Sequence, residues 1–519
     1  MTRLATVIAL ALALLAGVAQ ALSIAFPATG QPLWWLQLLS LAVLAWLLHG
    51  ARSWRRATLL GWCFAAAWLT TTFWWLFISM HVYGGLASPL AAVAVLALAA
   101  ILALYYAAAA GVFVALRLRS PMLSAVLFGG VWLVAELLRG TWFTGFPWGA
   151  GGYAHVDGPL AVLAPFVGVY GIGFAACLIA YALSLAARAA TWRSWRYWAV
   201  LLATAGLLAA CNIASLARTD SVSRAPPLSI ALLQGNIPQD EKFQPGTGVP
   251  QALRWYGEQL RDNSASLVVA PETAIPLLPQ QLPEGYLEAL RERYSQGDQA
   301  ALIGIPLGSM DEGYTNSAIG FKPGSAVYRY DKHHLVPFGE FIPPLFRWFT
   351  DLMNIPLGDF NRGPLGQPTF DWKGQRLAPN ICYEDLFGEE IGVQFRDAAK
   401  APTILVNMSN IGWFGNTVAI DQHLQISRMR AIEFRRPVIR ATNTGATAII
   451  DDRGHVLQLL PRLTRGVLAG VVQGQTIITA YARWVSRFGL RPLWLLGFAI
   501  IGASWWLRRR GTRRTESPM

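Results

Sequence analysis

Long apolar runs constrain this chain more than any other feature of its sequence. About seven of them precede residue 220 and one more covers residues 488–507, each near the roughly 20 residues with which an α-helix crosses a bilayer. The first seven lie near residues 4–24, 34–49, 57–79, 87–116, 121–139, 159–187 and 196–216. We therefore expect a membrane domain (1–219), an outer domain (220–487), and a C-terminal span with an Arg-rich tail (488–519).

The arginines of the chain indicate how it is oriented. Net charge is +13, although only 14% of the residues are charged and 54% are hydrophobic. The excess lies in short loops and tails beside the apolar runs, so we do not expect a nucleic-acid-binding surface. The basic loops lie near residues 50–56, 117–120 and 188–196, whereas the loops near 25–33 and 80–86 have no Lys or Arg. This alternation predicts a multi-pass protein of the cell inner membrane, with both termini in the cytoplasm and the outer domain in the periplasm.

The first apolar run has an alternative interpretation. The sequence AQA at residues 19–21 is typical of a signal-peptidase site, so residues 1–21 are either the first span or a cleaved signal peptide. The predicted topology is the same in both cases, because the chain emerges on the outer side.

Two charged residues, Glu136 and Arg139, fall at the end of an apolar run. Charges inside a membrane are costly and usually face a protein interior. At a spacing of i, i+3 on one helix the two side chains can pair with each other. The alternative is that Arg139 helps to hold an anionic head group.

The outer domain is predicted to be an α/β sandwich. Short β-like runs alternate with helical stretches at residues 249–262, 283–295 and 419–434, in a domain long enough for one hydrophobic core. The β-like runs lie at residues 228–235, 265–272, 300–308, 316–322, 325–332, 376–384, 402–410, 437–445, 446–452 and 466–472.

Three reactive side chains, Glu272, Lys332 and Cys382, each come at the end of such a β-like run. If the strand ends converge, the thiol has a carboxylate base and a cation beside it, an arrangement that can break and form acyl bonds. Cys382 is the only cysteine of the outer domain, and the other three cysteines fall within apolar runs. Taken singly, each residue has an ordinary interpretation: a strand end, a solvated turn and a buried, inert thiol.

His333 and His334 offer a further alternative, because they directly follow Lys332. They could form a Cys–His pair or part of a metal site. No further His lies at a spacing typical of metal ligands, and Glu272 already supplies a base. We therefore expect neither a metal nor a soluble cofactor.

Six sequence blocks occur together in the outer domain. They are QGNIPQDEKF at 234–243, PETAIP at 271–276, DKHHLVPFGEFIP at 331–343, ICYED at 381–385, SNIGWFG at 409–415 and ATNTG at 441–445. These blocks resemble the nitrilase, or carbon–nitrogen hydrolase, superfamily and, more closely, the bacterial apolipoprotein N-acyltransferases. The resemblance covers essentially the whole chain. It implies a multi-span α-helical membrane domain and a four-layer αββα sandwich that carries the site.

The resemblance also implies roles for particular residues. Glu272 is expected to be the general base, Lys332 the oxyanion partner and Cys382 the nucleophile. The backbone N–H of Tyr383 is a second candidate donor to the oxyanion. The further positions expected to shape the site are Glu340, Tyr383 and Glu384.

Two positions depart from the family pattern. Phe243 stands where relatives often have Trp, so an aromatic contact is kept and an indole N–H is lost. Ile411 stands where relatives often have an acidic residue. Two apolar parts of the outer domain are expected to be lids at the bilayer surface, namely the segment 341–360 and the pair Trp413 and Phe414. The alternative is that these residues pack into the core of the domain.

The activity that the resemblance implies is an acyl transfer. An acyl chain passes from a membrane phospholipid to the N-terminal amine of the diacylglyceryl-cysteine of an apolipoprotein, through a Cys382 thioester and in two half-reactions, as the final step of lipoprotein maturation. The partners are then the phospholipid, the apolipoprotein and the bilayer. One alternative is a membrane-tethered amidase or nitrilase, which leaves the seven leading spans unexplained. Another is a transporter or scaffold with an inactive domain, against which the complete triad argues.

Overall fold

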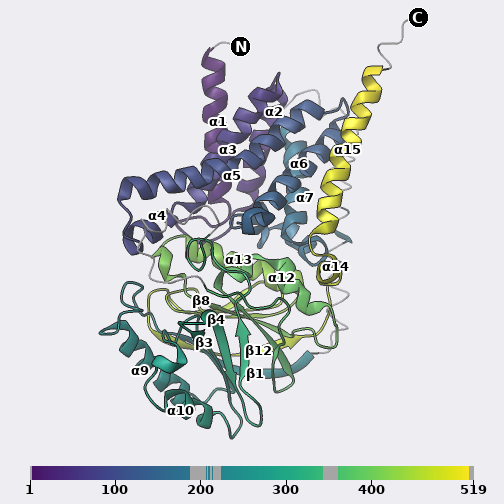
Figure 1. Cartoon of the computed structure of the whole chain (residues 1–519). Coiled ribbons are helices and arrows are strands. Elements are labelled where there is room, and N and C mark those ends of the chain that lie inside the picture. The colour runs from purple at the N-terminus through teal and green to yellow at the C-terminus, as the bar shows by residue number, and fades with distance from the viewer. Residues whose placement is uncertain are drawn as a thin grey trace, which may run out of the picture. The chain divides into compact units, whose positions relative to one another are not determined.

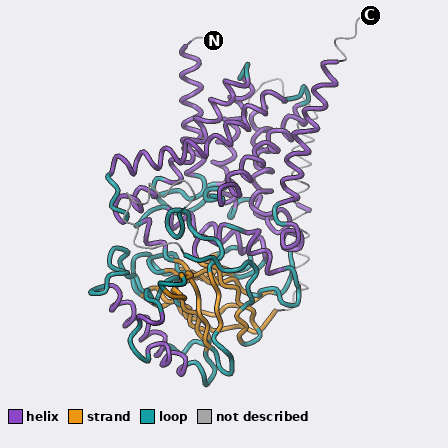
Figure 2. Tube along the Cα trace, in the orientation of Figure 1, coloured by secondary structure: helices purple, strands orange, loops and turns teal. Residues whose placement is uncertain are grey.

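Two facing β-sheets form the centre of the outer domain (Figures 1 and 2). The computed structural model describes residues 3–186, 206, 209–210, 213, 224–342 and 360–513. The first sheet has the order β12-β1-β2-β3-β4-β5, and its strands are β1 (Arg224–Gln234), β2 (Leu267–Val269), β3 (Ala300–Ser309), β4 (Gly313–Phe321), β5 (Tyr328–Asp331) and β12 (Gly466–Gln475). The second has the order β11-β10-β9-β8-β7-β6, and its strands are β6 (Phe370–Trp372), β7 (Gln375–Ile381), β8 (Ile404–Ser409), β9 (Val438–Thr442), β10 (Ala448–Ile450) and β11 (Val456–Leu459).

The alternation of side chains along β1 explains the layers. Leu228, Ile230 and Leu232 lie in the core shared by the two sheets, whereas Ala231 and Leu233 lie in a second core. That second core includes residues of α9 (Gly248–Asp262) and α10 (Tyr286–Arg293), which cover the outer face of the first sheet. On the second sheet, α13 (Ala419–Phe434) packs against β9, and all of its residues except Asp421 are buried. The predicted four-layer α/β sandwich is confirmed.

The sequence did not predict the two outermost strands of the second sheet. Every β-like run corresponds to a strand, but β6 has only three residues and β11 only four. An edge strand bonds to a neighbour on one side only, and β11 is largely exposed, so neither carries a long apolar run.

The chain divides into two compact units. The helical unit comprises the described residues of Met1–Trp74, Ala92–Ser221 and Phe488–Met519. The sandwich unit comprises those of Trp75–Ala91 and Val222–Arg487. The long helices are α1 (Arg3–Leu22), α2 (Trp34–Gly50), α3 (Trp54–Phe73), α5 (Ser88–Leu116), α6 (Pro121–Thr141), α7 (Ala164–Ala186) and α15 (Arg491–Arg513). The expected domain boundaries stay a prediction, because compactness does not locate a membrane.

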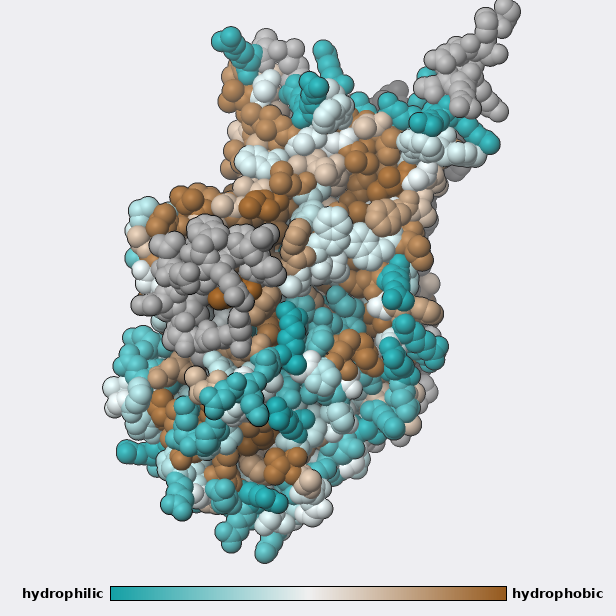
Figure 3. Space-filling model, in the orientation of Figure 1, coloured by the Kyte–Doolittle hydropathy of each residue, from teal (hydrophilic) through white to brown (hydrophobic). Residues whose placement is uncertain are grey.

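Several of these helices are long and apolar enough to cross a membrane. Within the described residues, four helices have the length and the apolar composition needed to cross a membrane. The number rises to six if each of two bent helix pairs forms a single span. The predicted run at 34–49 corresponds to α2, whose 17 residues make it shorter than the others, and the run at 196–216 lies outside the described residues. The helical unit exposes large apolar side chains such as Leu15, Val93 and Leu495, and its surface in Figure 3 carries broad hydrophobic patches. This is the surface expected of helices in contact with lipid.

Glu136 and Arg139 are buried in the helical unit without forming an ion pair with each other in the described part of the chain. Arg139 donates to the Tyr106 hydroxyl at 2.8 Å and to the carbonyls of Phe146 and Trp148 at 2.6 and 2.7 Å. Glu136 accepts a hydrogen bond of 3.0 Å from the backbone N–H of Gly151. Both charges therefore hold the Gly- and aromatic-rich loop that follows α6. A head-group contact of Arg139 stays a prediction.

The sandwich unit includes the segment Trp75–Ala91, which ends in the first turn of α5. Trp75 donates from its indole to Gln422 Oε1 at 3.0 Å, and its ring lies 4.2 Å from that of Phe414. Tyr83, in the short π-helix Ser79–Tyr83, contacts Trp413 edge to face at 5.9 Å. Residues between two apolar helices thus contribute to the surroundings of the GWFG turn, which the sequence alone did not indicate.

Candidate active site

The three predicted catalytic residues each lie just beyond the end of a strand. Glu272 follows β2, Lys332 follows β5, and Cys382 follows β7. Lys332 Nζ lies 3.3 Å from Glu272 Oε1, and Cys382 is electrostatically coupled to both of these groups. The structure therefore brings the three residues together.

Two carboxylates share one cation in this site. Lys332 Nζ donates to Glu340 Oε1 at 2.8 Å as well as to Glu272 Oε1, and its side chain is buried. The amide of Asn316 also bridges the pair, since Nδ2 lies 2.7 Å from an oxygen of each carboxylate. The other oxygen of Glu272 accepts from the backbone N–H of Asn410 at 2.7 Å. Glu272 is thus fixed from three sides, as a base with a defined orientation needs to be.

Cys382 has an unusual backbone conformation. Its φ is +54°, in the left-handed region that a residue with a side chain rarely adopts. The carbonyl of Cys382 accepts from His423 Nε2 at 3.2 Å and from Asn407 Nδ2 at 3.4 Å. The residue is only partly buried. The thiol therefore lies on a strained turn at the end of β7, and hydrogen bonds from His423 and Asn407 hold the backbone of that turn.

The charges around the thiol determine its protonation. Desolvation and the neighbouring Glu272 raise the pKa of Cys382 to about 12, although Lys332 and a hydrogen bond with Ser409 act in the opposite direction. Burial lowers the pKa of Lys332, but Glu340 and Glu272 outweigh it and leave that pKa above its ordinary value. At neutral pH the lysine is a cation and the thiol is protonated, so attack by sulfur requires a base to take its proton.

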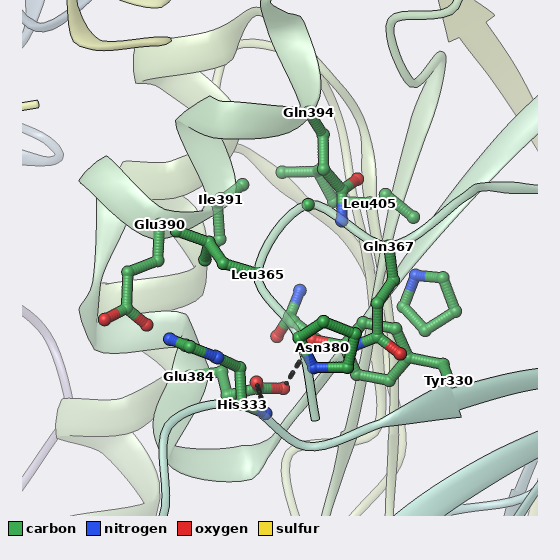
Figure 4. A pocket seen from close by; sticks show the side chains of 14 residues that line it. Tyr330, His333, Leu365, Gln367, Asn380, Glu384, Glu390, Ile391, Gln394 and Leu405 are labelled. Carbon is green, nitrogen blue, oxygen red and sulfur yellow. Dashed lines mark hydrogen bonds between the residues drawn. The ribbon is translucent and has the colours of Figure 1, made fainter. Parts of the chain in front are cut away.

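Glu384 ties the ends of β5 and β7 together. One oxygen accepts from the Tyr330 hydroxyl at 2.8 Å and from Ile381 N at 2.6 Å, and the other from His333 N at 2.7 Å. Burial raises the pKa of Glu384, while these bonds act in the opposite direction. Figure 4 shows the pocket beside Glu384, which is also lined by Glu390. The three predicted triad residues do not line this pocket, although Glu384, which does, is only two residues from Cys382 in the chain.

Lys242 is a buried lysine that the sequence pattern did not indicate as part of the site, although it lies in the block 234–243. Its Nζ donates to the backbone carbonyl of Glu272 at 3.1 Å. Burial lowers the pKa of Lys242 to about 7, while Glu272 and Cys382 act in the opposite direction. The equally buried Asn316 was also missed, because it sits inside an ordinary β-like run.

Aromatic residues stand close to Lys242. Phe243 stacks on Trp413 with ring centroids 6.4 Å apart, and Lys242 Nζ lies 5.9 Å from the Phe243 ring. Trp413 and Phe414 are partly buried, whereas Ile411 is fully buried. Apart from the first two residues and the last, the predicted lid at 341–360 lies outside the described residues.

The hydrogen bonds of the His333 and His334 rings are made to residues other than Cys382. His333 Nδ1 lies 2.8 Å from the carbonyl of Gly363, and His334 Nδ1 lies 2.9 Å from Glu390 Oε1 with its ring stacked on Phe387. In the parts of the chain that the structure describes, no group of three or more His, Cys, Asp or Glu is placed to hold a metal ion.

Comparison with known proteins identifies the family. Residues 16–182 match the apolipoprotein N-acyltransferase N-terminal domain, and residues 229–481 match the carbon–nitrogen hydrolase domain. The apolipoprotein N-acyltransferase of Verminephrobacter eiseniae is 62% identical over 497 residues, which is 92% of each chain. That of Ralstonia nicotianae is 48% identical over 481 residues, 92% of this chain and 90% of the relative. A CN-hydrolase superfamily protein of known structure from Xanthomonas campestris aligns with 52% of this chain and 97% of its own, at 20% identity and a TM-score of 0.36.

Identity of this extent runs through both the helical and the sandwich regions, so it covers the membrane-spanning part as well as the site. The chain therefore belongs to the apolipoprotein N-acyltransferase family and is an acyltransferase of the nitrilase superfamily.

Proposed function

We propose that this protein transfers an acyl chain from a membrane phospholipid to the α-amine of the diacylglyceryl-cysteine of an apolipoprotein, through a thioester on Cys382. The observation that carries the proposal is the cluster of Glu272, Lys332 and Glu340 beside the thiol of Cys382. It provides a base, a cation and a nucleophile in one place, which acyl transfer requires. Membership of the family supports both the lipid donor and the lipoprotein acceptor.

In the first half-reaction the sulfur of Cys382 attacks the ester carbonyl carbon of the phospholipid while Glu272 takes the thiol proton. Negative charge then develops on the carbonyl oxygen, where Lys332 and the backbone N–H of Tyr383 stabilise it. One such donor is typically worth roughly 3 kcal/mol of barrier. The carbon–oxygen bond breaks, the leaving alkoxide takes the proton from Glu272, and a lysophospholipid departs from the thioester.

In the second half-reaction the neutral α-amine of the lipoprotein attacks the thioester carbonyl. Glu272 now takes a proton from the amine, the carbon–sulfur bond breaks, and the thiolate regains its proton. The product is an N-acylated lipoprotein, and the enzyme returns to its starting state. No step uses a metal or a soluble cofactor.

The protein is a multi-pass membrane protein, and we place it in the cell inner membrane with the catalytic domain in the periplasm and both termini in the cytoplasm. The arrangement of arginines along the chain supports this topology. It puts the thiol on the same side as the outer leaflet, from which the donor lipid enters.

Incubation of the purified protein with labelled phospholipid, with ammonia release assayed in parallel, tests the function. We expect a labelled acyl-enzyme and, after addition of a diacylglyceryl-cysteine peptide, a labelled amide. Ammonia release from a soluble amide or nitrile without acyl-enzyme would support the amidase alternative. Neither product would support an inactive scaffold.

A further inference from the structure

The peptide group between Cys382 and Tyr383 has two ends with different environments. Its N–H belongs to Tyr383 and faces the oxyanion in the proposed function. Its C=O belongs to Cys382 and accepts from His423 Nε2 at 3.2 Å and from Asn407 Nδ2 at 3.4 Å. Whatever binds the carbonyl therefore acts on the same amide that serves the reaction.

The position of the proton on His423 follows from its second contact. Arg440 Nη2 lies 2.8 Å from His423 Nδ1. A guanidinium only donates, so Nδ1 must present its lone pair and the proton must be on Nε2. Burial and the charge of Arg440 hold the pKa of His423 well below its usual range, so the ring is neutral. The ring therefore donates from Nε2 to the carbonyl of Cys382.

Arg440 is itself fixed by residues on either side of it. Its Nη1 donates to Ser427 Oγ at 2.6 Å and lies 3.8 Å from the Asp385 carboxylate, to which Ser427 also donates. Asp385 comes three residues after Cys382 in the same short helix, Cys382–Leu386. Asp385, Ser427, Arg440 and His423 are all fully buried. The network thus begins and ends on the turn that carries the nucleophile.

We infer that His423, held in one tautomer by Arg440, is a positioning residue that orients and polarises the Cys382–Tyr383 peptide for stabilising the oxyanion. A donor on a peptide carbonyl increases the positive charge on the N–H at the other end, because hydrogen bonds in a chain polarise one another. The same bond helps to keep Cys382 at a φ of +54°. This role rests on the proposed thioester mechanism and adds to it a residue that touches neither substrate nor sulfur.

Two reactions of the same thiol separate this role from a general effect on folding. Acylation of Cys382 passes through an oxyanion, whereas alkylation by iodoacetamide displaces iodide and forms none. The variants are His423→Leu, which removes the donor, and His423→Gln, whose amide can accept from Arg440 and donate to the carbonyl. Ile426→Ala, a buried substitution on the same helix, serves as the control for lost packing. His423→Met replaces His423→Leu if the latter cannot be purified.

The rates to be compared are acyl-enzyme formation from a radiolabelled phospholipid in detergent micelles and alkylation of the Cys382 peptide followed by mass spectrometry. We expect His423→Leu to slow acylation at least about tenfold and to change the alkylation rate less than about threefold. His423→Gln should recover most of the acylation rate. Equal losses in both reactions, or no loss in either, would overturn the role of His423. Absence of any acyl-enzyme in the unaltered protein would instead overturn the thioester mechanism itself.

Discussion

At the residue scale, Lys332 balances the charge of the site, because it is the cation between Glu272 and Glu340. Lys332→Met would leave two carboxylates that, among the described residues, only Asn316 links. We expect acyl transfer to fall by at least about a hundredfold, from loss of oxyanion stabilisation, and the melting temperature to fall as well. Lys373→Met is the matched control, since Lys373 pairs with Asp298 at the surface, and its transfer rate should stay near that of the unaltered protein. A near-normal rate for Lys332→Met would mean that its role is misassigned.

Glu272→Gln tests the base with a side chain of the same size. The amide oxygen can still accept from Asn316, whereas the NH2 group cannot accept from the Asn410 N–H, and the amide cannot take the thiol proton. Because the pKa of Cys382 is about 12, the thiol does not ionise unaided near neutral pH. We expect at least about a hundredfold slower acyl-enzyme formation, measured in a single turnover, with the fold intact by circular dichroism. Unchanged kinetics would show that another group accepts the proton.

Lys242 provides a prediction about stability and pH. Its pKa is lowered to about 7 in the folded protein, below that of an ordinary lysine, so between these two values the unfolded chain binds more protons than the folded one. Stability from this group therefore rises as pH increases through that window. We expect the melting temperature of the unaltered protein to rise, relative to that of Lys242→Met, between pH 7 and about 9 in detergent. A constant difference across this range would contradict the lowered pKa.

The sequence predicted the reactive side chains better than their supporting contacts. Glu272, Lys332 and Cys382 stand out because charge or a thiol directly after an apolar run is unusual. Asn316, Lys242 and His423 carry no such local signal, and each acts on a partner at least 30 residues away. Their importance depends on contacts between distant strand ends, which a one-dimensional pattern does not contain.

At the scale of elements, the turn Ile411–Phe414 joins the aromatic side chains next to the site. We propose that Trp413 lines the path of the donor acyl chain, so Trp413→Asp would place a charge where an acyl chain must pass. Transfer from a long-chain phospholipid should then fall much further than reaction with a short, water-soluble ester, because the thiol chemistry is unchanged. Trp413→Phe, which keeps an aromatic ring, is the control. Equal losses on both substrates, with a lowered melting temperature, would mean that this residue holds the fold.

Elements with a strong periodic pattern were predicted well, whereas very short strands and associations between segments distant in the chain were not. The helical stretches at 249–262 and 419–434 correspond to α9 and α13 within one residue at each end. By contrast, the association of Trp75–Ala91 with the sandwich depends on contacts such as Trp75 with Gln422, which lies almost 350 residues further along the chain. Apolar periodicity identifies a helix but does not specify its partner.

At the scale of the whole molecule, access of the thiol to the donor lipid depends on the side of the membrane on which each loop lies. The arginine pattern predicts that reporters fused after residues 53, 118 and 192 report the cytoplasm. Reporters near residues 30, 83, 150 and 300 should report the periplasm. Alkaline phosphatase fusions are active in the periplasm and green fluorescent protein fusions fluoresce in the cytoplasm, so the two reporters should give opposite signals at each position. A consistent inversion across the loops would contradict the topology.

In the proposed mechanism the acyl chain passes through the sulfur of Cys382. The most direct measurement isolates the protein after a single exposure to labelled phospholipid and locates the label by peptide mass spectrometry. We expect one acyl group on Cys382, released by hydroxylamine and transferred to the amine of a diacylglyceryl-cysteine peptide when that peptide is added. Cys382→Ala should carry no acyl group and form no product. Product formation by Cys382→Ala, or an acyl group on Cys382 that the peptide cannot remove, would contradict the thioester mechanism.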